Sequence, residues 1–126
     1  MDTSARPIHI LVIEDDDSVA TVLQHVLTSQ DYQVDVANDL SALRASREQL
    51  PDVILLDLLM PTMSGDETVL HLREMPDTRD IPIVLMSGAS DLPRHAAELG
   101  VAIYLSKPFD LDDLLAALRQ ALSVPR

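Results

Sequence analysis

Four short hydrophobic runs stand out along the chain, each bounded by polar residues. They span residues 10–13, 53–56, 83–86 and 101–105. Continuous apolar runs rich in β-branched side chains predict strands buried on both faces, as in a parallel sheet. A fifth stretch, residues 33–36, alternates polar and apolar positions and predicts a half-exposed edge strand.

The segments between these runs carry apolar residues at helical spacing. They predict five helices, over residues 17–27, 41–48, 66–74, 91–99 and 111–122. Asp16 or Asp17 is available to cap the first helix and Asp110 the last, and Gly100 suits the C-terminal cap of the fourth. The predicted buried stripes are Val19, Val22, Leu23, Val26 and Leu27 in the first helix, and Leu111, Leu114, Leu115, Leu118 and Leu122 in the last.

Strands and helices alternate along the whole sequence. This order predicts an α/β fold with a five-stranded parallel sheet, doubly wound with helices on both faces. We expect one domain over residues 1–126, with its core at about 8–122, because no linker or repeat interrupts the pattern.

Composition narrows the classes of function. The formal net charge is -12, which disfavours direct nucleic-acid binding and favours divalent cations and basic partners. The chain has no cysteine, so a disulfide framework or thiolate metal site is excluded. No apolar run is long enough for a membrane span, and we expect a cytoplasmic protein that does not bind membranes.

Chemically informative residues follow the predicted strands. Glu14 and Asp15 come after the first run, Asp57 after the second, Ser87 after the third, and Lys107 after the last. In open parallel α/β sheets, ligands bind beyond the carboxyl ends of the strands. We therefore expect these residues to converge. Lys107 is also the only lysine in a chain that otherwise uses arginine.

Clustered carboxylates repel one another unless a cation lies among them, and an all-oxygen ligand set suits Mg²⁺. A carboxylate such as Asp57 can act as a nucleophile and form an acyl phosphate. Lys107 and the Ser87 hydroxyl could then bind phosphoryl oxygens. The pattern points to phosphoryl transfer onto an aspartate.

Four segments carry a resemblance to a known family: residues 10–16 (ILVIEDD), 51–61 (PDVILLDLLMP), 63–65 (MSG) and 104–109 (YLSKPF). In this order and spacing they resemble response-regulator receiver domains of two-component signal transduction, the class that includes chemotaxis regulators. The resemblance covers about residues 8–122. It implies the flavodoxin-like strand order 2-1-3-4-5 with five helices.

The resemblance also implies roles for single residues. Asp57 matches the phosphoacceptor, Asp15 the direct metal ligand, and Glu14 the neighbouring acid. The Leu59 carbonyl would complete the protein's ligands to Mg²⁺, for which Mn²⁺ can substitute.

Three further positions match residues that respond to the phosphoryl group. Lys107 would pair with the acceptor and then with phosphoryl oxygens, while Ser87 and Tyr104 would reorient as a switch. The resemblance also implies a cis peptide bond before Pro108.

A receiver domain of this kind is a switch and not a turnover enzyme. It would take its phosphoryl group from a sensor histidine kinase or phosphotransfer protein and then regulate a partner or output domain. The family also implies homodimerisation through the fourth helix, fifth strand and fifth helix. Residues 102–103 (Ala-Ile) and a shortened stretch between Ser87 and Lys107 depart from the family pattern on that face.

Three alternatives remain. A receiver-like scaffold that works without phosphorylation would not need the acids and Lys107 that this chain keeps. A haloacid-dehalogenase-type phosphatase needs a second aspartate two residues after the nucleophile, where Leu59 stands. A flavodoxin or nucleotide-binding protein needs a phosphate-binding loop after the first strand, where three acids stand.

Overall fold

The computed structural model describes residues 7–37, 50–60 and 63–123. A five-stranded sheet runs through it in the order β2-β1-β3-β6-β7, and every neighbouring pair is parallel. The strands are β1 (His9–Ile13), β2 (Gln33–Ala37), β3 (Val53–Asp57), β6 (Ile83–Ser87) and β7 (Ile103–Ser106). Counting only these five, the order is 2-1-3-4-5, which confirms the predicted α/β class and topology.

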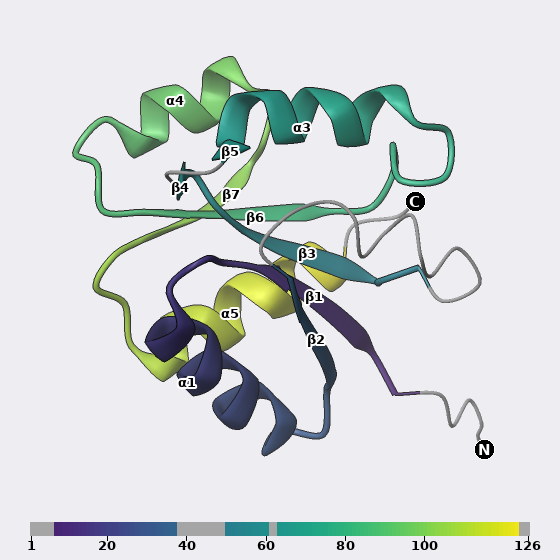
Figure 1. The fold of residues 1–126 in the computed structure, drawn as a ribbon, viewed down its shortest axis with the longest axis vertical. Coiled ribbons are helices and arrows are strands. Elements are labelled where there is room, and N and C mark those ends of the chain that lie inside the picture. Colours follow the sequence, from purple (N-terminus) through teal and green to yellow (C-terminus); the bar gives the residue numbers. More distant parts are fainter. Residues whose placement is uncertain (1–6, 38–49, 61–62, 124–126) are drawn as a thin grey trace.

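Four helices lie within the described residues and cover both faces of the sheet. They are α1 (Asp17–Thr28), α3 (Gly65–Glu74), α4 (Leu92–Glu98) and α5 (Leu111–Leu122). Figure 1 shows α3 and α4 on one face and α1 and α5 on the other. The remaining helix of the five, predicted over residues 41–48, lies outside the described residues.

Strand alternation divides the core into two layers. In β1, Leu11 and Ile13 join the buried cluster that contains residues of α3 and α4, whereas Ile10 and Val12 join the cluster with α1 and α5. Successive side chains of a strand point to opposite faces, so one continuous apolar run fills both layers.

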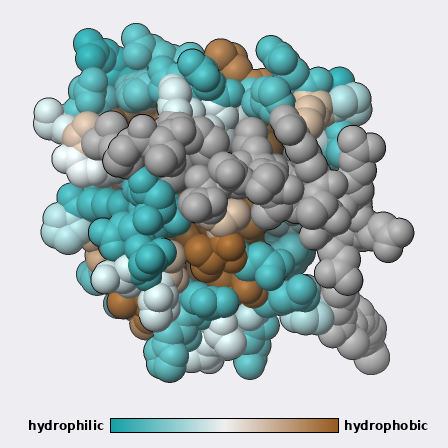
Figure 2. All heavy atoms as spheres, in the orientation of Figure 1, coloured by the Kyte–Doolittle hydropathy of each residue, from teal (hydrophilic) through white to brown (hydrophobic). Residues whose placement is uncertain are grey.

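On the face drawn in Figure 2, the coloured residues are mostly hydrophilic, with a hydrophobic area near the middle beside residues drawn in grey.

The predicted helix caps are confirmed. The Asp16 carboxylate accepts hydrogen bonds from the backbone N–H groups of Ser18 and Val19, and the Asp110 carboxylate accepts one from Asp113. Gly100 has a φ of +72°, the left-handed conformation that ends many helices.

Two details of the sequence prediction are wrong. The helical pattern predicts that Val22 and Leu111 are buried, but they are 60% and 42% exposed, because small residues such as Ala20 and Ala117 take inward positions instead. The last strand begins at Ile103 and not at residue 101, because the Val101 N–H donates to the Ala96 carbonyl in the cap of α4.

A small hairpin follows β3 and was not predicted. Strands β4 (Leu59–Met60) and β5 (Met63–Ser64) pair antiparallel as a separate two-stranded sheet. Two-residue strands are too short to leave a periodic signal in a sequence. The hairpin leads the chain from Asp57 into α3, whose N-cap is Ser64.

Candidate functional site

The site lies at the carboxyl edge of the sheet, where the parallel strands end together. Glu14 follows β1, Asp57 is the last residue of β3, Ser87 is the last residue of β6, and Lys107 follows β7. The Lys107 N–H donates to the Ser87 carbonyl at 2.8 Å, which continues the pairing of β6 and β7 to this point. The strand ends therefore bring together residues that are far apart in the sequence, as predicted.

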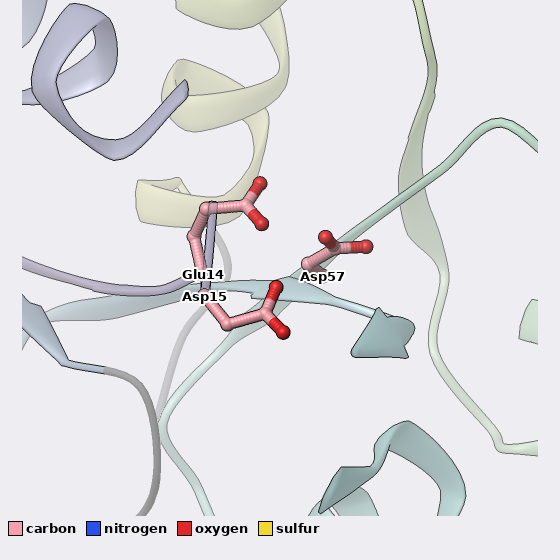
Figure 3. A group of neighbouring side chains, drawn as sticks. All are labelled: Glu14, Asp15 and Asp57. Atoms are coloured by element: carbon pink, nitrogen blue, oxygen red, sulfur yellow. The ribbon is translucent and has the colours of Figure 1, made fainter. Parts of the chain in front are cut away.

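Three carboxylates meet at this edge. Glu14, Asp15 and Asp57 each offer an oxygen, and these oxygens all lie within 4.8 Å of one another. Figure 3 shows the three side chains converging, two from the loop after β1 and one from the end of β3. Glu14 and Asp57 are buried, with 3% and 4% of their surface exposed, and Asp15 is half-buried.

One ammonium group contacts two of these carboxylates. Lys107 Nζ lies 3.0 Å from Glu14 Oε1 and 3.2 Å from Asp57 Oδ2. The peptide bond between Lys107 and Pro108 is cis, as the resemblance implied. The Asp16 N–H also donates to Glu14 Oε2 at 3.3 Å. Asp16 thus caps α1 through its side chain and contacts the Glu14 carboxylate through its backbone N–H.

The pKa values of the buried groups reflect this crowding. Burial, together with the hydrogen bond and charge of Asp57, raises the pKa of Glu14, and the contact with Lys107 does not offset this. For Lys107, burial acts to lower the pKa, but the hydrogen bonds to Glu14 and Asp57 outweigh it and the pKa is raised. Glu14 therefore holds a proton more readily than a free glutamate does, and Lys107 gives up its proton less readily than a free lysine does.

The donor set fits a divalent cation. When ionised, the three carboxylates carry three negative charges, and Lys107 neutralises only one of them. Hard oxygen ligands without sulfur or imidazole are those that Mg²⁺ prefers. Leu59, predicted to contribute its carbonyl, lies in β4 two residues beyond Asp57, and that contribution stays a prediction.

The two switch residues are placed differently. Ser87 is buried beside the site, and its Oγ accepts a hydrogen bond from the Ala89 N–H at 3.0 Å. Tyr104 lies on edge strand β7 and is 39% exposed. Their predicted reorientation stays a prediction, and the Ser87 contact is one that such a movement would alter.

Removing one buried acid should stabilise the metal-free protein. Because the pKa of Glu14 is raised above its ordinary value of 4.5, the folded state binds that proton more tightly than the unfolded chain does. Stability from this group is present below pH 4.5 and is lost as the pH rises through the folded-state pKa. We therefore expect Glu14→Gln to unfold at a higher temperature than the wild type at pH 8 in EDTA, with a smaller difference at pH 4.5.

Magnesium should reverse that advantage. A ligand at about 100 times its Kd stabilises the folded state by about 2.7 kcal/mol, and the wild type should gain more than Glu14→Gln. Thermal unfolding followed by circular dichroism with and without MgCl₂ measures both effects. An equal gain in the two proteins would show that Glu14 does not take part in metal binding.

Comparison with known proteins identifies the family. The family model described as "Response regulator receiver domain" matches residues 10–119. The chain therefore belongs to the response-regulator receiver domain family of two-component systems.

Curated relatives agree with this assignment. Response regulator MprA of Mycobacterium sp. (strain KMS) is 36% identical over 119 residues, covering 92% of this chain and 51% of the relative. Transcriptional regulatory protein PrrA of Mycobacterium tuberculosis is 36% identical over 125 residues, covering 97% and 53%. The chain thus spans about half the length of these relatives. Because PrrA is named a transcriptional regulatory protein, the expectation that this chain does not bind nucleic acid has no support from its relatives.

Solved structures show the same fold. Chemotaxis protein CheY4 of Vibrio cholerae superposes with a TM-score of 0.82 at 28% identity, covering 93% of this chain and all of that one. The receiver domain of sensor histidine kinase PA1611 of Pseudomonas aeruginosa also gives 0.82 at 28% identity, covering 94% and 100%. That structure is described with a magnesium ion coordinated in its active-site cleft.

Within the described part of this chain, no helix has the length and apolar character needed to span a membrane.

Proposed function

We propose that Asp57 accepts a phosphoryl group from a phosphohistidine of a sensor histidine kinase or phosphotransfer protein, in a Mg²⁺-dependent reaction. The observation that carries the proposal is the position of Lys107 Nζ, 3.2 Å from Asp57 Oδ2 and 3.0 Å from Glu14 Oε1, beside a third carboxylate. The family membership of the chain agrees with this function.

The chemistry follows from the residues at the sheet edge. A carboxylate oxygen of Asp57 attacks phosphorus in line, the new O–P bond forms as the P–N bond breaks, and the electron pair stays on the imidazole nitrogen. Lys107 lies where it can donate to the transferred phosphoryl oxygens as their charge shifts. Mg²⁺ held by Asp15, Asp57, the Leu59 carbonyl and, directly or through water, Glu14 would neutralise further charge. Mn²⁺, which accepts the same oxygen ligands, would substitute.

The protein itself is the acceptor, so the reaction ends with one phosphoryl group on one chain and is not turnover catalysis. Ser87 would then donate a hydrogen bond from its hydroxyl to a phosphoryl oxygen, and Tyr104 would move inward from its exposed position. A population shift of this kind requires only differential contacts in the two states. Regulation of a partner or output domain, and homodimerisation through α4, β7 and α5, belong to the same proposal.

Incubation with acetyl phosphate and MgCl₂ tests the proposal. Intact mass spectrometry should show one added phosphoryl group on the wild type, lost with Asp57→Ala and with EDTA. Asp112→Asn, which neutralises an exposed acid in the first turn of α5, is the matched control and should be phosphorylated normally. A folded wild-type protein that gains no phosphate would favour the alternative function, a scaffold that works without phosphorylation.

The lifetime of the acyl phosphate gives a separate prediction. Leu59, two residues beyond the acceptor, and Ala89 have apolar side chains that cannot orient a water molecule for hydrolysis. We expect slow autodephosphorylation and a half-life several-fold shorter in Leu59→Asn, because an amide can hydrogen-bond the attacking water. The half-life is measured by following the decay of the phosphorylated form after acetyl phosphate is removed. An unchanged half-life would argue against this role for position 59.

A further inference from the structure

Helix α4 is joined to α3 by a polar contact that the proposed chemistry does not use. His95 Nε2 of α4 lies 2.6 Å from Asp66 Oδ1 in the first turn of α3. Both side chains are partly exposed, His95 at 29% and Asp66 at 53%. The residues are 29 positions apart, so the contact links two elements that the chain does not join directly.

The α3 end of this contact is tightly connected to the phosphoacceptor. Gly65, which precedes Asp66, packs so closely on Leu58 that an added Cβ would lie 2.8 Å from the Leu58 Cα. Leu58 follows Asp57 directly, and its N–H donates to the Met86 carbonyl at 3.0 Å. The N-terminus of α3 is therefore held against the strand end that carries Asp57, and Asp66 is a fixed point relative to the acceptor.

At its start, helix α4 is held by packing, through the fully buried side chain of Leu92, and not by a side-chain cap. The N-cap residue, Asp91, makes no side-chain capping hydrogen bond, and α4 has only seven residues. The loop that leads into α4 is shaped by the hydrogen bond from the Ala89 N–H to Ser87 Oγ. If Ser87 turns its hydroxyl toward a phosphoryl group, this bond must change, and the loop and the uncapped start of α4 are the segments next to the change.

We propose that the His95–Asp66 contact is a latch that holds α4 in its unphosphorylated position and so opposes the switch. The latch joins a fixed point beside Asp57 to the helix that follows the moving loop. A contact made in one state and stretched in the other shifts the equilibrium toward the first state. This inference rests on the proposed phosphoacceptor function, because the switch that the latch opposes is driven by the phosphoryl group.

The effect should be modest, in keeping with a partly exposed pair. Loss of the His95–Asp66 contact should shift the equilibrium toward the phosphorylated conformation by about twofold to fivefold. The readout is the apparent affinity for beryllofluoride, a phosphoryl analogue, in the presence of MgCl₂. His95→Ala and Asp66→Ala should each bind it more tightly by about that factor, and the double variant should show no further gain, since either change alone breaks the contact.

Two additional measurements separate the latch from other effects. Amide hydrogen exchange without Mg²⁺ or beryllofluoride should be faster in α4 of both variants, which tests the tether independently of phosphorylation. Arg94→Ala is the matched control, because its partner Asp91 lies beside α4 itself and the pair does not reach α3. This variant should leave the affinity unchanged.

Each possible result of these experiments either supports or overturns the latch. Unchanged affinity in His95→Ala and Asp66→Ala, or an additive gain in the double variant, would overturn the latch even if α4 exchanged faster. A wild-type protein that failed to bind beryllofluoride would overturn the proposed function, and with it the latch. In that case exchange in α4 would still show whether the contact holds the helix. Tighter binding in both variants without additivity supports the latch.

Discussion

Replacing Lys107 with alanine is expected to slow phosphorylation of Asp57 by about 10²–10³-fold, the usual cost of removing one group that stabilises developing charge. Lys107 is the only group in the described structure whose ammonium contacts both Glu14 and Asp57. Its loss leaves the transferred oxygens without this donor. The rate with acetyl phosphate and saturating MgCl₂, followed by intact mass, measures the effect.

Two controls make this result specific. Arg119→Ala removes an exposed cation from α5 and should leave the rate within about twofold, because exposed charges contribute little. Circular dichroism should show that the Lys107→Ala protein is folded in MgCl₂. A folded variant phosphorylated as fast as the wild type would exclude Lys107 from the reaction.

Gly65→Ala should lower the free energy of unfolding by about 1–3 kcal/mol, although alanine favours helices more than glycine does. The added Cβ would lie 2.5 Å from Leu58 Cδ2 and 2.8 Å from Leu58 Cα. The side-chain atom can move, but the backbone atom can do so only by shifting the end of β3. Urea unfolding of the variant and the wild type in EDTA gives the difference.

The other two glycines supply controls for this prediction. A Cβ at Gly88 would have Lys107 Cβ at 3.9 Å as its nearest neighbour, so Gly88→Ala should change stability by less than about 0.5 kcal/mol. Gly100 has open space but a φ of +72°, so Gly100→Ala should cost about 1–2 kcal/mol through backbone strain alone. A Gly65→Ala protein as stable as Gly88→Ala would contradict the close contact with Leu58.

The sequence predicted the sheet well because its signals are local and strong. Buried runs such as residues 53–56 are continuous, and each ends in a residue that parallel pairing places at one edge. This geometry is why the sequence alone indicates that Glu14, Asp15, Asp57 and Lys107 lie together. The resemblance added the strand order, which spacing alone does not determine.

The remaining features depend on tertiary contacts. A helical stripe does not show whether Val22 or Ala20 faces the sheet, since neighbouring elements decide which side is covered. Likewise, Val101 lies outside the strand predicted for it, because its N–H donates to a carbonyl at the end of α4. The sequence does not indicate a role for His95, because a histidine and an aspartate 29 residues apart carry no shared pattern.

Asp57 and Lys107 are 50 residues apart in the sequence, and Glu14 and Lys107 are 93 residues apart. Each side chain reaches the site only after the central strands have paired and edge strand β7 has joined β6. A chain in which these strands have not yet paired would not hold Glu14, Asp57 and Lys107 together. The capacity to accept phosphate should thus appear late in folding and all at once, so that acyl phosphate formation can serve as an assay for the completed native state.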